Sequence, residues 1–524
     1  MNFLVFLMVG FLLMMLFFCF FGVFFVSFSL FEWEFLSVKL NFFFNSLLFF
    51  VILMVISLSV LIFSSYYMMG ELMMGYYLVV LMIFVGSMVM LIFSSSAFSM
   101  LLSWDLLGIS SFFLVLFYNN WDSNLGAMNT ALTNRLGDYF LFCFLATFAF
   151  GNFFFFTFTV IVNSMVVLLL LSSFTKSAQF PFSGWLPKAM SAPTPVSSLV
   201  HSSTLVTAGL VLLMNFNLLV LGYSFLKVLL IIGLFTMFFS SLAALYEEDM
   251  KKVVALSTLS QMGFMVFTLG LGLHFVSFLH LVSHALFKSC LFIQMGYFIH
   301  SNYSQQDGRF YGSNGSLFLF VQLQLLVTLF CLCGLLFTSG MISKDYILEM
   351  FFYNFFYLWL SIFFVISVFL TFGYSYRLWK SFFLSFSKRV IEFSTSYLLN
   401  FYSFLLVFFS IVFLSWVSSN LFILPSVFLY MDVYLPLLYV MTLLVAMYLA
   451  IKLFMKFIVY KFFVDYFAKL FSYLGINLKF FDLGLVKGGN CLFFVFNNFS
   501  KIFVMFMSSL GYNSVVIMVF FLFM

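Results

Sequence analysis

Long apolar stretches run along almost the whole chain, and short polar segments separate them. At about 20 residues per membrane crossing, these stretches predict roughly 15 transmembrane helices. The expected spans are residues 3–30, 42–64, 73–93, 97–118, 136–158, 160–180, 195–217, 222–245, 253–272, 275–299, 316–340, 346–372, 400–420, 433–455 and 508–524. The pattern therefore predicts an all-α polytopic membrane protein.

One stretch, Thr175 to Gly209, does not fit a simple membrane helix. Its second residue, Lys176, stands at the end of an apolar run. Four prolines follow: Pro181, Pro187, Pro193 and Pro195. A charged lysine in a bilayer costs roughly 2.5–3.5 kcal/mol on insertion scales, and a broken helix is tolerated there only where it lines protein or a cavity. Because His201 follows in apolar surroundings, we expect a discontinuous helix that lines a path for protons or cations.

Two aspartates lie in the spans before this stretch. Asp105 stands in the middle of one apolar span, and Asp138 lies three residues after Arg135 in the next. Such acids can be structural hydrogen-bond partners, but intramembrane acids more often mark ion paths. Arg135 is equally well explained by an ion pair with Asp138 at the membrane edge. A carboxylate at ~7 Å would stabilise a charged Lys176 by about 2.4 kcal/mol at an effective dielectric constant of ~20. The alternative is that Lys176 extends to the membrane surface.

A second set of titratable residues has helical spacing. His280, His284 and Lys288 are four residues apart, so they share one face of a helix. We interpret them as a proton wire; a metal site is disfavoured because no acid joins this face and the lysine repels cations. Lys344 follows the weak point at Gly340 and repeats the pattern of a lysine at a helix break. Two such breaks predict an internal repeat, as in many transporters.

The polar loops predict an orientation. Counting crossings places the loops 246–252, 301–315 and 376–392 on one side of the membrane. They carry these basic residues: Lys251, Lys252, Arg309, Arg377, Lys380, Lys388 and Arg389. The positive-inside rule makes this the inner face. Farther along, residues 456–500 carry a polar stripe on an apolar, aromatic background, which predicts a helix lying along the membrane or on partner helices.

Composition narrows the function classes. Of the 524 residues, 65% are hydrophobic and 7% are charged, which excludes a soluble globular protein. The net charge of +5 is too small and too scattered for a nucleic-acid partner. The six cysteines show neither metal-ligand spacing nor a disulfide framework. The short loops leave no room for a soluble catalytic domain, and Met1–Leu30 is expected to be a retained span and not a cleaved signal.

Six motifs carry a family resemblance: NRLGDYF (134–140), KSAQFPFSGWLPKAMSAPTPVSSLVHSSTLVTAG (176–209), DMKKVVALSTLSQMG (249–263), HALFKSCLF (284–292), HSNYSQQDGRFYG (300–312) and SKDYILE (343–349). Together they resemble the antiporter-like subunits of respiratory complex I, in particular the mitochondrial NADH dehydrogenase subunit 5 family. The resemblance is specific over residues 30–390, whereas the tail fits by architecture only. A short N-terminus and a Phe-rich composition resemble the nematode versions.

The resemblance implies two inverted five-helix repeats and a C-terminal lateral amphipathic helix. The implied divisions are 1–72 (N-terminal helices), 73–217 and 218–392 (the two antiporter-like repeats), 393–455 (C-terminal helices), 456–504 (lateral helix) and 505–524 (terminal anchor helix). Carried onto this chain, the implied site residues are the acids Asp105 and Asp138, the pumping lysine Lys176, the axis His201, His280, His284 and Lys288, and the distal lysine Lys344. The family usually has glutamate where Asp105 stands.

The function implied is that of a core membrane subunit of the proton-pumping NADH:ubiquinone oxidoreductase, in the mitochondrial inner membrane. No cofactor or metal is expected on this chain; FMN, iron–sulfur clusters, NADH and ubiquinone would belong to partner subunits. The expected partners are other complex I subunits, especially the antiporter-like neighbour beneath the lateral helix, and lipids such as cardiolipin. The alternatives are a subunit of a multisubunit sodium/proton antiporter and a structural subunit whose ionisable groups no longer act.

Overall fold

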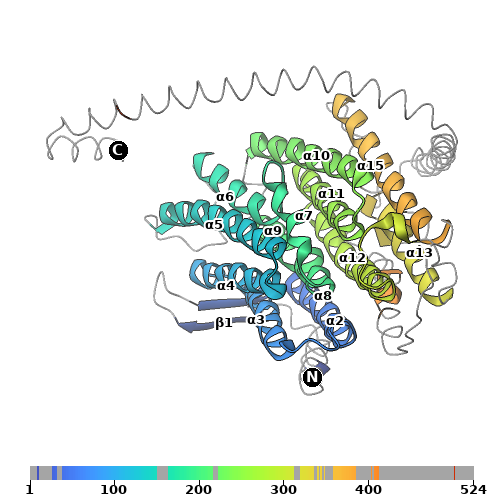
Figure 1. The fold of residues 1–524 in the computed structure, drawn as a ribbon. Helices are drawn as coiled ribbons and strands as arrows, with labels where there is room; N and C mark the ends of the chain where they lie inside the picture. Colours follow the sequence, from blue (N-terminus) through green and yellow to red (C-terminus); the bar gives the residue numbers. More distant parts are fainter. Residues whose placement is uncertain are drawn as a thin grey trace. The chain divides into compact units, whose positions relative to one another are not determined.

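The computed structural model describes residues 26–31, 38–149, 163–215, 222–311, 319–334 and 358–384, with residues 9, 10, 339, 340, 343, 344, 347, 403, 406–411 and 501. Most of them are helical (Figure 1). Residues 445–524 form a separate compact unit, of which only residue 501 is described. The expected lateral helix and terminal anchor helix therefore lie outside the described residues.

The described part opens with an exception to the all-α expectation. Strands β1 (Val26–Phe31) and β2 (Val38–Phe42) pair as an antiparallel ribbon, with Val26 opposite Phe42. The expected span 3–30 is therefore wrong at its end. Both strands alternate apolar and polar residues (VSFSLF and VKLNF), and such alternation favours a strand over a membrane helix.

Four helices follow the ribbon: α2 (Phe44–Tyr67), α3 (Met74–Phe93), α4 (Ala97–Val115, continued by the short η1, Leu116–Tyr118) and α5 (Trp121–Ala149). Helix α5 begins fifteen residues before the expected span 136–158. The polar stretch after Asn119, expected as a loop, starts this helix instead. The Ser123 hydroxyl accepts from the backbone N–H of Asn120 at 2.8 Å and donates to its carbonyl oxygen. Short polar side chains of this kind satisfy the free backbone groups at a helix start.

The next segment is discontinuous, as predicted. Its pieces are α6 (Asn163–Lys176), η2 (Phe182–Gly184), α7 (Trp185–Lys188), η3 (Ala189–Ser191), α8 (Thr194–Val196), the π-helical η4 (Ser197–Thr204) and α9 (Leu205–Asn215). Glycine allows close packing around it: a Cβ at Gly209 would collide with the Ser173 carbonyl, and one at Gly137 with the Thr175 hydroxyl. Small residues therefore hold α5, α6 and α9 together at the level of Lys176.

The second half contains α10 (Gly222–Tyr246), α11 (Met250–Gly270), α12 (His274–Ser301), the short η6 (Gly308–Phe310), α13 (Leu319–Cys333) and α15 (Leu358–Trp379), which continues as η9 (Lys380–Leu384). Helix α11 lies between α10 and α12 (Figure 1), and almost every residue of α11 and α12 is buried. Among the described residues, seven helices are long and apolar enough to cross a membrane.

Parts of the three basic loops meet at one end of the bundle. Arg309 forms a salt bridge with Glu248 at 2.7 Å, and the Arg377 guanidinium donates to the Leu245 carbonyl. Asp307 accepts hydrogen bonds from Arg309 and holds the pKa of that guanidinium above its ordinary value. We call this the loop end. Lys251 departs from expectation: it lies in the first turn of α11 and is only 3% exposed, so it is not a loop residue.

Candidate functional site

The first group of site residues joins α4 to α5. The Arg135 guanidinium lies 3.5 Å from Asp105 and 3.3 Å from Asp138, so it bridges the two carboxylates. The other oxygen of Asp138 accepts the indole N–H of Trp104 at 2.9 Å. We call Asp105, Arg135 and Asp138 the acidic cluster. Its exposure falls from 57% at the Arg135 side chain through 34% at Asp105 to 8% at Asp138, so the cluster leads from the surface inward.

Lys176 lies at the inner end of this group and is fully buried. Its ammonium donates to the Trp104 carbonyl at 2.7 Å and sits 3.7 Å from the centre of the Trp104 ring. The acid–lysine pair that the resemblance implies is not a direct contact here: Asp105 is paired with Arg135, and among the described residues no carboxylate oxygen lies within 4 Å of this ammonium. The lysine is buried in the protein and does not extend to its surface, which is against the alternative. Trp104 links the acidic cluster to this lysine, because its indole N–H donates to Asp138 and its backbone carbonyl accepts from Lys176.

His201 lies in the π-helical segment η4 and is 1% exposed. Its two ring nitrogens have no hydrogen-bond partner among the described residues. Its ring is 6.0 Å from that of Trp185, whose indole N–H donates to the Thr175 carbonyl at 3.0 Å. One aromatic ring therefore separates His201 from the segment that ends at Lys176. Because buried polar atoms nearly always have a partner, we expect water beside His201.

The second group lies on α12, as the four-residue spacing predicts. His280 contacts Ser343 at 2.8 Å through Nδ1 and Gln261 at 3.1 Å through Nε2. The Lys288 ammonium donates to the Ser257 hydroxyl at 2.5 Å. Both nitrogens of His284 lack a partner among the described residues. We call His280, His284 and Lys288 the histidine axis; all three are fully buried.

Lys344 closes this second group. It is 3% exposed, and its ammonium donates to the Leu332 carbonyl at 2.6 Å, in the last turn of α13. Gly334, at φ 75°, permits the close approach, because a Cβ there would lie 2.8 Å from the lysine Cδ. The neighbouring Ser343 is the residue that contacts His280. The segment carrying this lysine is therefore connected directly to the histidine axis.

The structure thus places seven of the eight predicted residues in two groups, and among the described residues it gives His201 no hydrogen bond to either group. Four further residues that the sequence did not place in the site contact these groups. Arg135 was weighed only as an edge ion pair. Ser257 and Gln261 are four apart in an apolar stretch, a signal like that of the histidines. Nothing in the sequence marked Trp104, because its role depends on both its indole and its backbone carbonyl.

Comparison with known proteins gives the family of the chain. Residues 94–371 match the family "NADH:quinone oxidoreductase/Mrp antiporter, TM". The chain is 59% identical over 506 residues to NADH-ubiquinone oxidoreductase chain 5 of Caenorhabditis elegans, covering 96% of this chain and 94% of the relative. It is 58% identical over 516 residues to the Ascaris suum protein of the same name, covering 97% and 94%.

A solved structure gives the fold independently. The Mrp complex from Dietzia sp. DQ12-45-1b aligns with a TM-score of 0.63 at 22% identity, over 82% of this chain and 55% of that chain. Identity this low shows a shared fold and no more. The two nematode relatives, which match almost end to end, decide between complex I and a free-standing antiporter. The chain belongs to the NADH-ubiquinone oxidoreductase chain 5 family.

Proposed function

We propose that this chain carries protons from Lys176 through His201 and the histidine axis to Lys344. As a member of its family, it is a membrane subunit of NADH:ubiquinone oxidoreductase in the mitochondrial inner membrane. The oxidation of NADH and the reduction of ubiquinone then belong to partner subunits, with their FMN and iron–sulfur clusters.

One observation carries the proposal: a buried lysine in each group rests on a neutral oxygen atom. Lys176 donates to a backbone carbonyl, and Lys288 donates to a serine hydroxyl. A buried charge is normally held by an opposite charge, because desolvation is costly. An ammonium that rests on neutral acceptors is held less firmly and can release its proton when the local field changes.

The acidic cluster is placed to supply that change of field. Asp105 and Arg135 are partly exposed, so a neighbouring subunit can contact them, and Trp104 connects Asp138 to Lys176. Moving a carboxylate away from ~7 Å removes about 2.4 kcal/mol of attraction at an effective dielectric constant of ~20. Moving one proton against the membrane potential costs about 2.3 kcal/mol per 100 mV. The two energies are of similar size, as a pump requires.

The finer architecture belongs to the same proposal. Two lysines lie at helix breaks: Lys176 ends α6, and Lys344 follows α13. This similarity supports two inverted five-helix repeats, over 73–217 and 218–392. The whole bundle would then contain about 15 helices. The lateral helix, 456–504, would lie on the antiporter-like neighbour. Exposed apolar side chains on α4 and α5 offer surfaces for other subunits or for lipids such as cardiolipin.

The test is the number of protons pumped per electron by the intact complex in proteoliposomes. We expect Lys176→Ala to assemble and to transfer electrons from NADH to ubiquinone, but to lose the protons that this subunit contributes. Lys227→Ala is the matched control, because Lys227 is exposed on α10 and outside both groups. An assembled Lys176→Ala complex with an undiminished proton-to-electron ratio would overturn the proposal.

A further inference from the structure

A cavity with a volume of about 890 Å³ lies at the loop end. The start of α5, the short pieces α7 and η3, and the segment before α11 form its walls. Carboxylates and amines line it: Asp122, Glu247, Asp249, Lys188, Lys251 and Lys252. It is therefore a charged, water-accessible cavity that reaches into the bundle beside the broken helix.

Two adjacent lysines in its wall differ sharply. Lys252 forms a salt bridge with Asp249 at 2.5 Å, and its side chain is 42% exposed. Lys251 is 3% exposed, donates to the Ala192 carbonyl at 3.4 Å, and has no carboxylate oxygen within 4 Å among the described residues. Lys251 thus resembles Lys176 in having a neutral carbonyl as its acceptor, although the proposed path does not use it.

Polar groups lie between Lys251 and the turn that carries His201. Ala192 lies at the helix break, and the buried hydroxyl of Thr194 contacts Tyr67, which also lines the cavity. The Ser197 hydroxyl donates to the Thr194 carbonyl at 2.8 Å, at the start of the π-helical turn that carries the histidine. Helix α11 packs against this turn. Buried hydroxyl groups therefore stand between the cavity and the imidazole of His201, and a proton path between them requires water in the remaining gaps.

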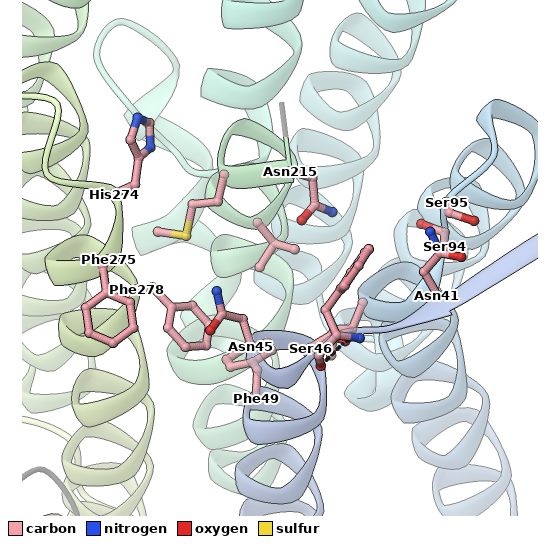
Figure 2. A pocket seen from close by; sticks show the side chains of 14 residues that line it. Asn41, Asn45, Ser46, Phe49, Ser94, Ser95, Asn215, His274, Phe275 and Phe278 are labelled. Carbon is pink, nitrogen blue, oxygen red and sulfur yellow. Dashed lines mark hydrogen bonds between the residues drawn. The ribbon is translucent and has the colours of Figure 1, made fainter. Parts of the chain in front are cut away.

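The cavity at the opposite end of these helices lacks this arrangement. It has a volume of about 460 Å³, and the side chains of Asn45, Asn215 and His274 from α2, α9 and α12 face it (Figure 2). Asparagine, serine and apolar side chains make up most of its lining, and no lysine, arginine or acid is among them. It therefore offers no buried amine that leads inward.

We propose that Lys251 takes up protons from the loop-end cavity and passes them by way of Thr194 to His201, which returns a proton to Lys176 after Lys176 has given its own to the proposed path. The step is a proton transfer only: the ammonium of Lys251 gives its proton through water to the Thr194 hydroxyl, which passes its own hydroxyl proton to the neutral imidazole of His201, and the amine of Lys251 regains a proton from the cavity. This inference rests on the proposed function, because it supplies the loading step for that path.

The test uses Lys251→Cys in the intact complex in proteoliposomes. We expect electron transfer to continue while the proton-to-electron ratio falls to that of Lys176→Ala. Aminoethyl methanethiosulfonate, applied from the loop side, attaches a protonatable amine to the cysteine and should restore the ratio. The trimethylammonium reagent attaches a permanent cation and should not restore it. Lys227→Cys, treated in the same way, is the control.

Each outcome decides a separate point. An undiminished ratio in Lys251→Cys, with loss in Lys176→Ala, would overturn this uptake route and leave the proposed function standing. Equal restoration by both reagents would show that Lys251 supplies charge and not protons. Unchanged ratios in both variants would overturn the proposed function itself. If Lys251→Cys does not assemble, a second variant, Asn129→Trp, tests the same route, because this substitution fills the cavity from its wall and leaves the lysine in place. A normal proton-to-electron ratio in Asn129→Trp would overturn the route.

Discussion

The two groups of site residues differ in how their charges are balanced. In the acidic cluster, two carboxylates share one guanidinium, and part of the cluster is exposed. Among the described residues around the histidine axis, the partners of the amines and imidazoles are hydroxyl, amide and carbonyl groups. The acids that the sequence places near Lys344, Asp345 and Glu349, lie outside the described residues.

On the proposed mechanism, this difference separates sensing from carrying. A cluster of paired charges at the surface would respond to a neighbouring subunit, because displacing one charge uncovers the others. A row of buried groups whose partners are neutral would pass protons along, because no fixed opposite charge holds a proton in place. The first group should therefore tolerate changes that preserve charge, whereas the second should fail once a fixed charge is introduced.

The largest effect on pumping is expected when a fixed negative charge is placed beside the histidine axis. Gln261→Glu places a carboxylate about where the amide oxygen lies, 3.1 Å from His280 Nε2. At ~4 Å and an effective dielectric constant of ~20, a charge pair gains about 4 kcal/mol. The imidazole should then retain its proton, and the pumping rate should fall by at least about tenfold. Gln261→Met, which adds no charge, is the control and should pump faster than the glutamate variant.

A smaller effect is expected at the link between Asp138 and Lys176. Trp104→Phe removes the N–H donor to Asp138 but keeps an aromatic ring under the ammonium. Hydrogen bonds to charged groups contribute about 1.5–3 kcal/mol, and only the part of this energy that changes as Lys176 releases its proton affects the rate, so a several-fold loss in pumping rate is expected. Trp104→Leu also loses the cation–π contact and should pump more slowly still. Equal pumping by both variants and the parent would show that Trp104 is no link.

The smallest effect is expected at the surface of the acidic cluster. Asp105→Glu restores the residue that the resemblance gives for this family, and it lengthens the side chain by one methylene. Exposed ion pairs contribute roughly 0.2–1 kcal/mol, so the proton-to-electron ratio should stay within error of the parent. A large loss, measured beside Asp105→Asn, would mean that the exact reach to Arg135 matters more than the charge.

The sequence predicted those features that depend on local spacing. The break after Lys176 followed from its prolines, and the shared face of His280 and Lys288 followed from the four-residue period. The pairing of Asp105 could not be predicted, because the rotation of α4 about its axis is set by packing against α5 and not by its own residues. The strand Val26–Phe31 was missed since its aromatic residues also fit a membrane span.

The hydrogen bond between Lys176 and the Trp104 carbonyl bears on how a buried lysine can gain and lose a proton without disturbing the fold. A neutral amine keeps two hydrogens, so Lys176 can remain bonded to the Trp104 carbonyl whether or not it carries the extra proton. Lys344 has the same option at the Leu332 carbonyl. If these lysines carry protons as proposed, each side chain keeps one acceptor through the cycle, and a change of charge alone can drive the transfer without a side-chain rotation.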